Sequence, residues 1–226
     1  GRNVDLEVRT RDTWTLNPGV NFSRAGGENE YALQIREKNL LGRGQALELE
    51  WQSDVDRDAL TLSFSDPHLL KNFTRLAVSY SDASDGSTKY FNLDRPFYAL
   101  DTRWSAGTVL SDSDFDVERW ELGKRVGKFD AHAQYYQING GWSAGLRDGW
   151  VRRWTYGATY QQSDFAPVPY EPLGGPLPAD RKFVYPWVGF ELVQDSFQER
   201  VNQDQIRRTK DVLVGFNGWA RLGYAT

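Results

Sequence analysis

The sequence predicts an all-β protein, an antiparallel meander that closes into a β-barrel. Three observations carry this prediction. Apolar and polar residues alternate with a period of two in one segment after another, these segments recur about every 15 to 20 residues between turn residues, and none has the periodicity of a helix. We therefore expect about twelve strands in a single domain of residues 13–226, preceded by the end of another domain at residues 1–12.

The clearest alternation lies between Glu30 and Leu70. A period of two places apolar and polar residues on opposite faces of a sheet. Two connections separate these strands, a glycine-containing turn at Asn39–Gly44 and a charged link at Asp54–Asp58. The predicted apolar face consists of Tyr31, Leu33, Ile35, Leu47, Leu49, Trp51, Leu60, Leu62 and Phe64.

The rest of the chain continues in the same way. The first strand is expected at Trp14–Phe22, where Pro18 suits an edge strand because proline has no amide donor. Ser111–Asp116 and the proline-rich residues 163–181 read as loops. Either residues 139–141 or residues 147–149 can supply the turn after the strand at 128–136. The last two strands are expected at 183–197 and 211–224, on either side of the charged segment 198–210.

Composition excludes several classes of protein. Lys and Arg total 27 against 31 Asp and Glu, so the net charge of -4 gives no electrostatic footprint for nucleic acid. The chain has no cysteine for a disulfide or a thiolate metal site. It starts at Gly1, has no methionine and no leader, and is therefore expected to be a processed piece. No run approaches the ~18 apolar residues of a transmembrane helix.

The side of the sheet that faces water decides between two kinds of barrel. A barrel of ten or more strands is too wide for apolar side chains to fill, so the apolar face belongs outside, against lipid. The polar faces mix both charge signs, as a hydrated lumen needs, and aromatic residues near strand ends are expected as girdles at the headgroup levels. The alternative is a soluble ligand-binding barrel or sandwich. The polar-face residues are Arg36, Glu48, Glu50, Asp94, Arg103, Arg119, Glu121, Arg153 and Arg221, and the girdle residues are Trp14, Trp51, Tyr80, Trp120, Tyr135, Trp150, Tyr160 and Tyr224.

Candidate sites for chemistry are few. His68 and His132 lie far apart without regularly spaced carboxylates, and Asp112, Asp114 and Asp116 lack the glycine turn and distal glutamate of a calcium loop. We expect no metal and no other cofactor. Phosphate-loop and zinc-protease motifs are absent. An outer-membrane hydrolase using Ser65, Asp66 and His68 is conceivable, but we expect no enzyme.

Two segments of the meander resemble the Omp85 superfamily of outer-membrane proteins, which includes barrel-assembly insertases, translocation-and-assembly proteins and surface-antigen D15-like proteins. Residues 37–45, with Asn39, Gly42 and Gly44, are similar to the family turn Asn-Leu/Phe-Leu-Gly-x-Gly. Residues 62–70 are similar to the family strand that ends in Asp/Asn-Pro, here Asp66-Pro67. Two features depart from the family: the Arg-Gly-Phe/Tyr motif is missing, and the chain does not end on an aromatic residue.

The resemblance implies a sixteen-stranded barrel of the bacterial outer membrane, incomplete here at its C-terminal end. Both turns would face the periplasm, upstream POTRA domains would precede the barrel, and residues 3–10 would be the closing strand of the last one. The partners would be outer-membrane lipid and an unfolded outer-membrane protein or secreted client. A weakly paired first strand would act as the gate; the alternative within the superfamily is to secrete or display an attached domain. The gate residues are Trp14, Leu16, Pro18, Val20 and Phe22.

Overall fold

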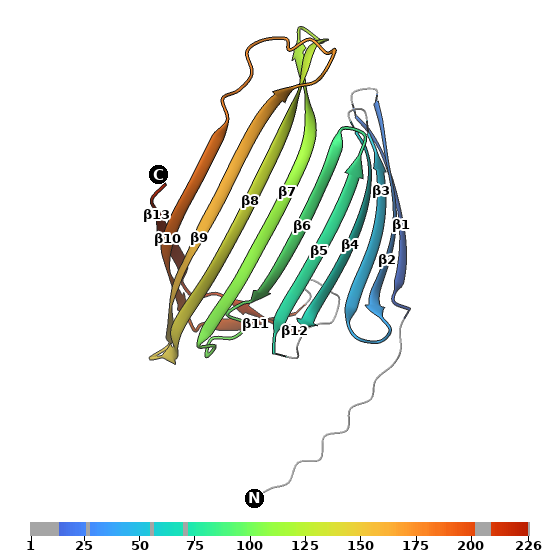
Figure 1. Ribbon diagram of the computed structural model, residues 1–226. Helices are drawn as coiled ribbons and strands as arrows, with labels where there is room; N and C mark the ends of the chain where they lie inside the picture. The colour runs from blue at the N-terminus through green and yellow to red at the C-terminus, as the bar shows by residue number, and fades with distance from the viewer. Residues whose placement is uncertain (1–13, 26–27, 55–56, 70–71, 202–208, 226) are drawn as a thin grey trace, which may run out of the picture.

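The computed structural model describes residues 14–25, 28–54, 57–69, 72–201 and 209–225, and within these ranges the chain is all-β (Figure 1). The described residues contain no helix long and apolar enough to cross a membrane. The strands are β1 (Leu16–Ala25), β2 (Glu28–Leu40), β3 (Gln45–Ser53), β4 (Asp58–Leu69), β5 (Thr74–Ala83), β6 (Gly86–Arg95), β7 (Trp104–Glu121), β8 (Lys124–Arg147), β9 (Trp150–Pro167), β10 (Arg181–Gln194), β11 (Phe197–Val201), β12 (Thr209–Leu213) and β13 (Asn217–Gly223).

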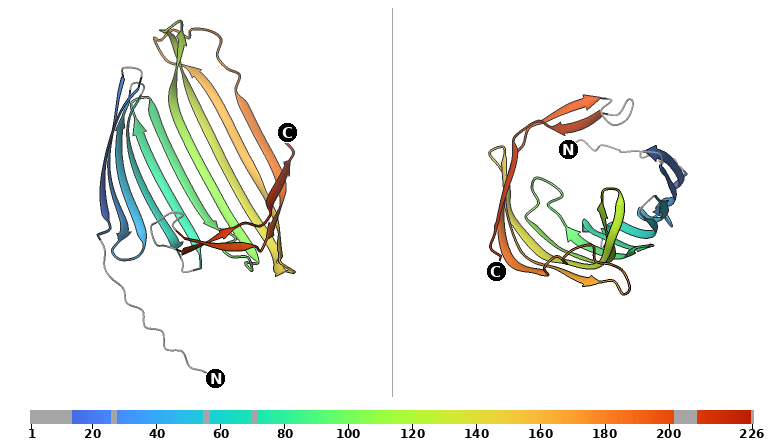
Figure 2. Two further views of the ribbon diagram at one scale, coloured as in Figure 1. Left: turned by 180° about the vertical axis from the view of Figure 1, so that it is seen from behind. Right: turned by 90° about the horizontal axis from the view of Figure 1, so that it is seen from above.

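Eleven of these strands form one antiparallel sheet in the order β1 to β10 followed by β13. The predicted meander is therefore confirmed. Within the described part of the chain, strands β11 and β12 pair only with each other, as a two-stranded unit between β10 and β13 in the sequence. Seen from above, the sheet curls into an arc that does not close (Figure 2). Among the described residues β1 pairs only with β2 and β13 only with β10, which leaves two open edges.

The tight turns contain residues with positive φ, each with a glycine in the second position. Leu122-Gly123 and Asp148-Gly149 connect their strands with φ of 49° and 78°, and 52° and 75°, as two-residue type I′ turns require. The turn predicted at Asn39–Gly44 is also confirmed, because β2 ends at Leu40, β3 begins at Gln45, and both glycines have positive φ. Asn39 closes it: its Oδ1 accepts a hydrogen bond from the amide of Gly44 at 2.7 Å.

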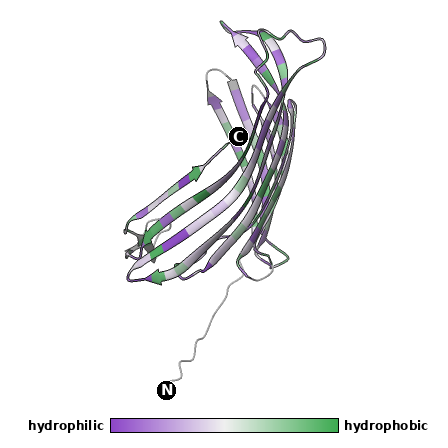
Figure 3. Cartoon of the chain, turned by 60° about the vertical axis from the view of Figure 1, so that its left-hand side comes forward, coloured by the Kyte–Doolittle hydropathy of each residue, from purple (hydrophilic) through white to green (hydrophobic). Residues whose placement is uncertain are grey.

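The register places the predicted apolar and polar sets on opposite faces. Ile35 lies opposite Leu49, which lies opposite Leu62, while Arg36 lies opposite Glu48 on the other face. Figure 3 shows the resulting alternation of hydrophobic and hydrophilic residues along the strands. Two cavities are lined mainly by the polar set, so this set faces the concave side of the sheet and the apolar set faces the convex side.

Three strand predictions are wrong, and one open alternative is decided. Ser111–Asp116 is no loop but part of β7, because the long strand β8 pairs with it along its whole length. Of the two turns that the sequence left open, residues 139–141 lie inside β8, and the turn is at Asp148-Gly149. Asp66 and Pro67 lie within β4, at an irregularity of its pairing with β5, and not in a turn. The predicted last two strands and the segment between them contain β10, the β11–β12 hairpin and β13.

The first strand has other bounds than predicted. Trp14 precedes β1, so the first strand begins at Leu16 and extends to Ala25, beyond the expected end at Phe22. The strand of a preceding domain predicted at residues 1–12 lies outside the described residues.

Candidate functional site

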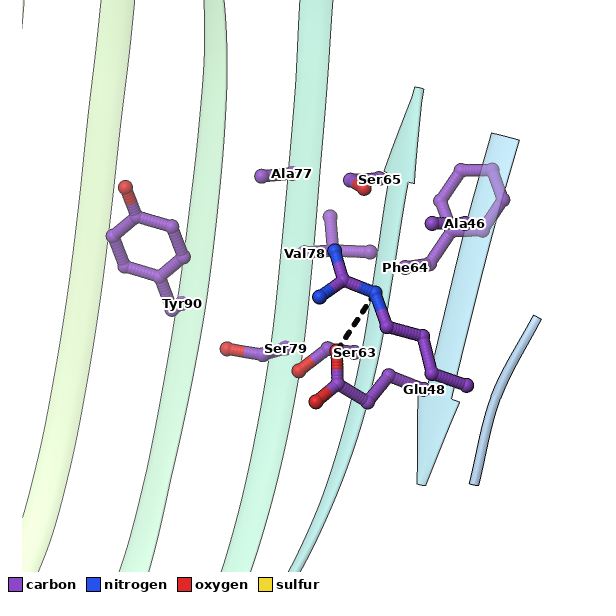
Figure 4. Close-up of a pocket in the computed structure, with 10 residues that line it drawn as sticks. Ala46, Glu48, Ser63, Phe64, Ser65, Ala77, Val78, Ser79 and Tyr90 are labelled. Carbon is purple, nitrogen blue, oxygen red and sulfur yellow. Dashed lines mark ion pairs between the residues drawn. The ribbon is translucent and has the colours of Figure 1, made fainter. Parts of the chain in front are cut away.

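A row of polar residues crosses the concave face from β2 to β6. Arg36 lies opposite Glu48, and the ladder continues through Ser63 and Ser79 to Tyr90. Figure 4 shows the last four of these side chains following one another across the strands. Arg36 Nε lies 3.4 Å from Glu48 Oε2, and the row borders a cavity of about 230 Å³. This face can therefore hold water and polar groups.

A larger cavity of about 530 Å³ lies toward the turn end of β2 to β6. Three of the residues predicted from the family-like turns, Gly44, Asp66 and Pro67, line it together. On its far side Arg75 donates two hydrogen bonds to the carboxylate of Asp94, at 2.5 and 3.2 Å. The structure thus brings the two family-like segments to one place, although Gly44 and Asp66 lie 22 positions apart in the chain.

Asp66 holds these segments together. It lies beyond the apolar residues of β4, toward the strand end, and its carboxylate accepts hydrogen bonds from Gln45 Nε2 at 2.8 Å and from the His68 amide at 2.9 Å. These hydrogen bonds, with Gln45 contributing most, lower the pKa of Asp66. The contact that Asp66 makes with His68 goes through the backbone, so it is not the carboxylate–imidazole pair of a hydrolase triad.

The segment between β6 and β7, residues 96–103, folds onto the concave face of β8 and β9. Arg153 anchors it: Nη1 donates to Glu191 Oε2 at 3.1 Å, Nη2 donates to the carbonyl of Ala99 at 3.2 Å, and the guanidinium carbon lies 4.9 Å from the centre of the Phe97 ring. Gly141 makes room for that ring, because a Cβ there would lie 2.8 Å from it. The loop therefore narrows the space enclosed by β8 to β10.

A second long segment, residues 168–180, packs against the part of β7 and β8 that extends past the other strands (Figure 1). The amide of Lys128 donates to the carbonyl of Pro172 at 2.8 Å. Arg119 donates to the carbonyls of Leu173 and Pro176 and lies over Phe129, which is buried. The loop predicted at 163–181 is shorter than expected, because β9 extends to Pro167.

The convex face carries a continuous belt of exposed and half-exposed apolar side chains. A protein surface in water rarely exposes a contiguous apolar patch of this extent. Val20, Leu62 and Ile138 have exposed fractions of 79%, 49% and 66%. The apolar belt crosses all of β1 to β10, through Pro18, Val20, Phe22, Tyr31, Leu33, Ile35, Leu47, Leu49, Trp51, Leu60, Leu62, Phe64, Leu76, Val78, Tyr80, Phe91, Leu93, Leu110, Tyr136, Ile138, Trp154, Tyr156, Tyr160, Val184, Val188 and Phe190.

Aromatic residues lie at both margins of the apolar belt. Trp104, Trp142 and Trp154 lie in one register row at the end where β8 turns into β9. Tyr80, Tyr136 and Tyr160 lie at the opposite margin, and polar residues follow them on the same face. Of the predicted girdle residues Trp51, Tyr80 and Tyr160 lie at this margin, but Tyr135 faces the concave side and Trp120 lies in the β7–β8 extension.

The predicted gate residues occupy the open edge. Leu16, Pro18, Val20 and Phe22 all lie in β1 and share the convex face, while Trp14 lies just before the strand. Pro18 is opposite Ile35 of β2, and no other described strand pairs with β1. Phe22 packs against Tyr31 with their ring centres 5.3 Å apart.

The structure brings together three chemically capable side chains that the sequence presented as separate candidates. Asp112 and Asp114 of β7 lie beside His132 of β8, with ligand atoms within 4.8 Å of one another. The signal in the sequence is the alternation of Asp112 and Asp114, which places both carboxylates on one face of a strand.

Comparison of the chain with models of protein families, with curated proteins and with solved structures finds no match.

Proposed function

We propose that this chain forms the wall of a β-barrel of the bacterial outer membrane, of the Omp85 type, which inserts or translocates other proteins. The apolar belt is the observation that carries the proposal. Its exposed side chains would be solvated favourably by lipid tails and unfavourably by water.

The apolar belt extends over most of the height of an outer-membrane apolar band. On β10 the outward row from Val184, in the tyrosine row, to Phe190, in the tryptophan row, covers about 20 Å at ~3.4 Å per residue, or about 16 Å across the membrane for a strand tilted by about 40°. This is about two thirds of the roughly 25 Å apolar band of outer-membrane barrels. The tryptophan and tyrosine rows at the two margins are what the headgroup layers favour.

The concave face fits a hydrated lumen. Its charges are paired across strands, as in Arg36–Glu48, Arg75–Asp94 and Arg153–Glu191, and most keep partial access to solvent. Such pairs are inexpensive beside water but costly beside lipid. An inverted arrangement, with the apolar belt inside, would leave these ions facing hydrocarbon.

The open edge of β1 supports the function as an insertase. The unpaired backbone groups of β1 can form hydrogen bonds with an incoming strand of a client protein. This pairing lowers the free energy that the client strand would otherwise need to expose its amides to lipid. Pro18 removes one donor from this edge, which favours a weak and reversible seam. The mechanism is mechanical and uses no catalytic residue.

Site-specific crosslinking tests the function. A photoreactive residue replaces Asn21 in β1 or, as the matched control, Ser79 in the interior strand β5, in the full-length protein in its membrane. During assembly of an unfolded outer-membrane client we expect crosslinks from position 21 and none from position 79. Equal yields from both positions, or none from position 21, would rule out templating by β1, and crosslinks to a domain of the same chain would favour the display role.

A further inference from the structure

The cluster of Asp112, Asp114 and His132 lies on the convex face, just past the tyrosine margin of the apolar belt. His132 is directly opposite Asp114, and Asp112 is one step along β7 toward Leu110. All three are outside the apolar belt, in the part of β7 and β8 where the face becomes polar. Their side chains are half-exposed, so an ion can reach them from outside.

The two ring nitrogens of His132 have different surroundings. Nδ1 lies 2.7 Å from Asp114 Oδ1, a normal hydrogen-bond distance. Nε2 lies 3.6 Å from Asp112 Oδ2, which is too long for a hydrogen bond. Two ligand atoms that each lie about 2.1 Å from one metal ion, with a ligand–metal–ligand angle of about 110–120°, are about 3.4–3.6 Å apart. The distance between Nε2 and Oδ2 agrees with this separation.

We propose that this cluster binds a divalent transition-metal ion such as Zn²⁺. His132 Nε2 and Asp112 Oδ2 are the ligands, and Asp114 accepts the Nδ1 proton, which fixes the ring and its tautomer as carboxylates do behind metal-bound histidines. Water or another small donor completes the coordination shell from the open side.

Neighbouring side chains orient the carboxylate of Asp112. Gln134 Nε2 donates to Asp112 Oδ2 at 3.0 Å, and the hydroxyl of Tyr136 donates to the same oxygen at 3.3 Å. Such preorganisation reduces the entropy that a ligand loses when the metal binds. Lys89 is opposite Asp112 on β6, and it opposes metal binding with its positive charge.

The bound ion would link β7 to β8 close to the position where β6 stops covering β7. Gly86, the terminal residue of β6 at this end, lies opposite Phe115 of β7. The ion would thus stabilise the base of the β7–β8 extension. The inference does not depend on the proposed function, since it rests on side chains outside the apolar belt.

Calorimetric titration of the chelator-treated, detergent-solubilised protein with Zn²⁺ tests the site. We expect one equivalent to bind, His132→Gln to abolish binding, and Asp114→Asn to weaken it about 10- to 100-fold. His68→Gln is the matched control, because it removes the other histidine and should leave binding unchanged. Circular dichroism verifies that each variant is folded.

Three results would overturn the proposal. Wild-type protein that binds no Zn²⁺ would show that His132 is only ion-paired with its two carboxylates. Undiminished binding by His132→Gln would place the metal elsewhere. Undiminished binding by Asp114→Asn would remove Asp114 from its orienting role and leave the geometry without support.

Discussion

Arg153 should be the most costly single charge to remove from the concave face. Replacing Arg153 with Ala deletes its hydrogen bonds to Glu191 and to the carbonyl of Ala99, and its contact with the Phe97 ring. The Arg153 side chain is only 11% exposed, but Glu191 is 29% exposed, so water partly compensates the carboxylate that remains. Breaking a fully buried pair costs about 3–5 kcal/mol, and for this half-buried pair we expect about 2–3 kcal/mol.

Arg36→Ala provides the matched control on the same face. The Arg36 and Glu48 side chains are 42% and 23% exposed, so this pair should contribute at most about 1 kcal/mol. Urea titration in detergent, followed by tryptophan fluorescence, gives both free energies of unfolding. Tryptic cleavage after Arg103, at the end of this loop, reports whether the loop has left β8 and β9. A loss for Arg153→Ala no larger than that for Arg36→Ala, with the loop equally protected, would refute the anchoring role.

Two other perturbations test the packing and the charge network. Gly157→Val should lower the free energy of unfolding by about 1–3 kcal/mol, because a Cβ there would lie 2.6 Å from the Trp187 ring. Gly19→Ala should leave it nearly unchanged, because the added Cβ would make only ordinary contacts. Equal urea midpoints for the two variants would contradict this expectation. Stability should fall at acid pH through Asp66: hydrogen bonds lower its pKa in the folded state, so its contribution is complete well above the unfolded pKa of about 3.9 and is lost as the pH falls through the lower folded value. Asp66→Asn should remove this dependence, and an unchanged stability–pH curve would contradict the assignment.

The opening strands were predictable because one face of each is apolar. In β2 to β5 a shift of one residue would move the whole apolar set to the polar face, so the alternation alone fixes the register. The turns at Leu122-Gly123 and Asp148-Gly149 are equally local, although only the structure distinguishes the second from the Gly140-Gly141 pair inside β8.

The cluster around His132 was not predictable, because it depends on one irregularity. Near the turn, Trp120 lies opposite Arg125, but beyond a bulge Arg119 lies opposite Gly127. Without this extra residue His132 would lie opposite Ser113, on the other face from Asp112 and Asp114. A similar limit explains Ser111–Asp116: over residues 111–114 both faces of β7 are polar, so the strand there leaves no apolar period in the sequence.

In the barrel that we propose, the convex face meets lipid while the concave face meets water. The chain has no cysteine, so single-cysteine variants at the adjacent positions Leu62 and Ser63 of β4 report the two faces without background. In intact membranes we predict that a charged, water-soluble maleimide labels Ser63→Cys rapidly and Leu62→Cys hardly at all, while a lipid-embedded maleimide shows the reverse. Rapid labelling of Leu62→Cys by the water-soluble maleimide would contradict this orientation. So would a protein that stays soluble without detergent and in which neither cysteine reacts with that reagent.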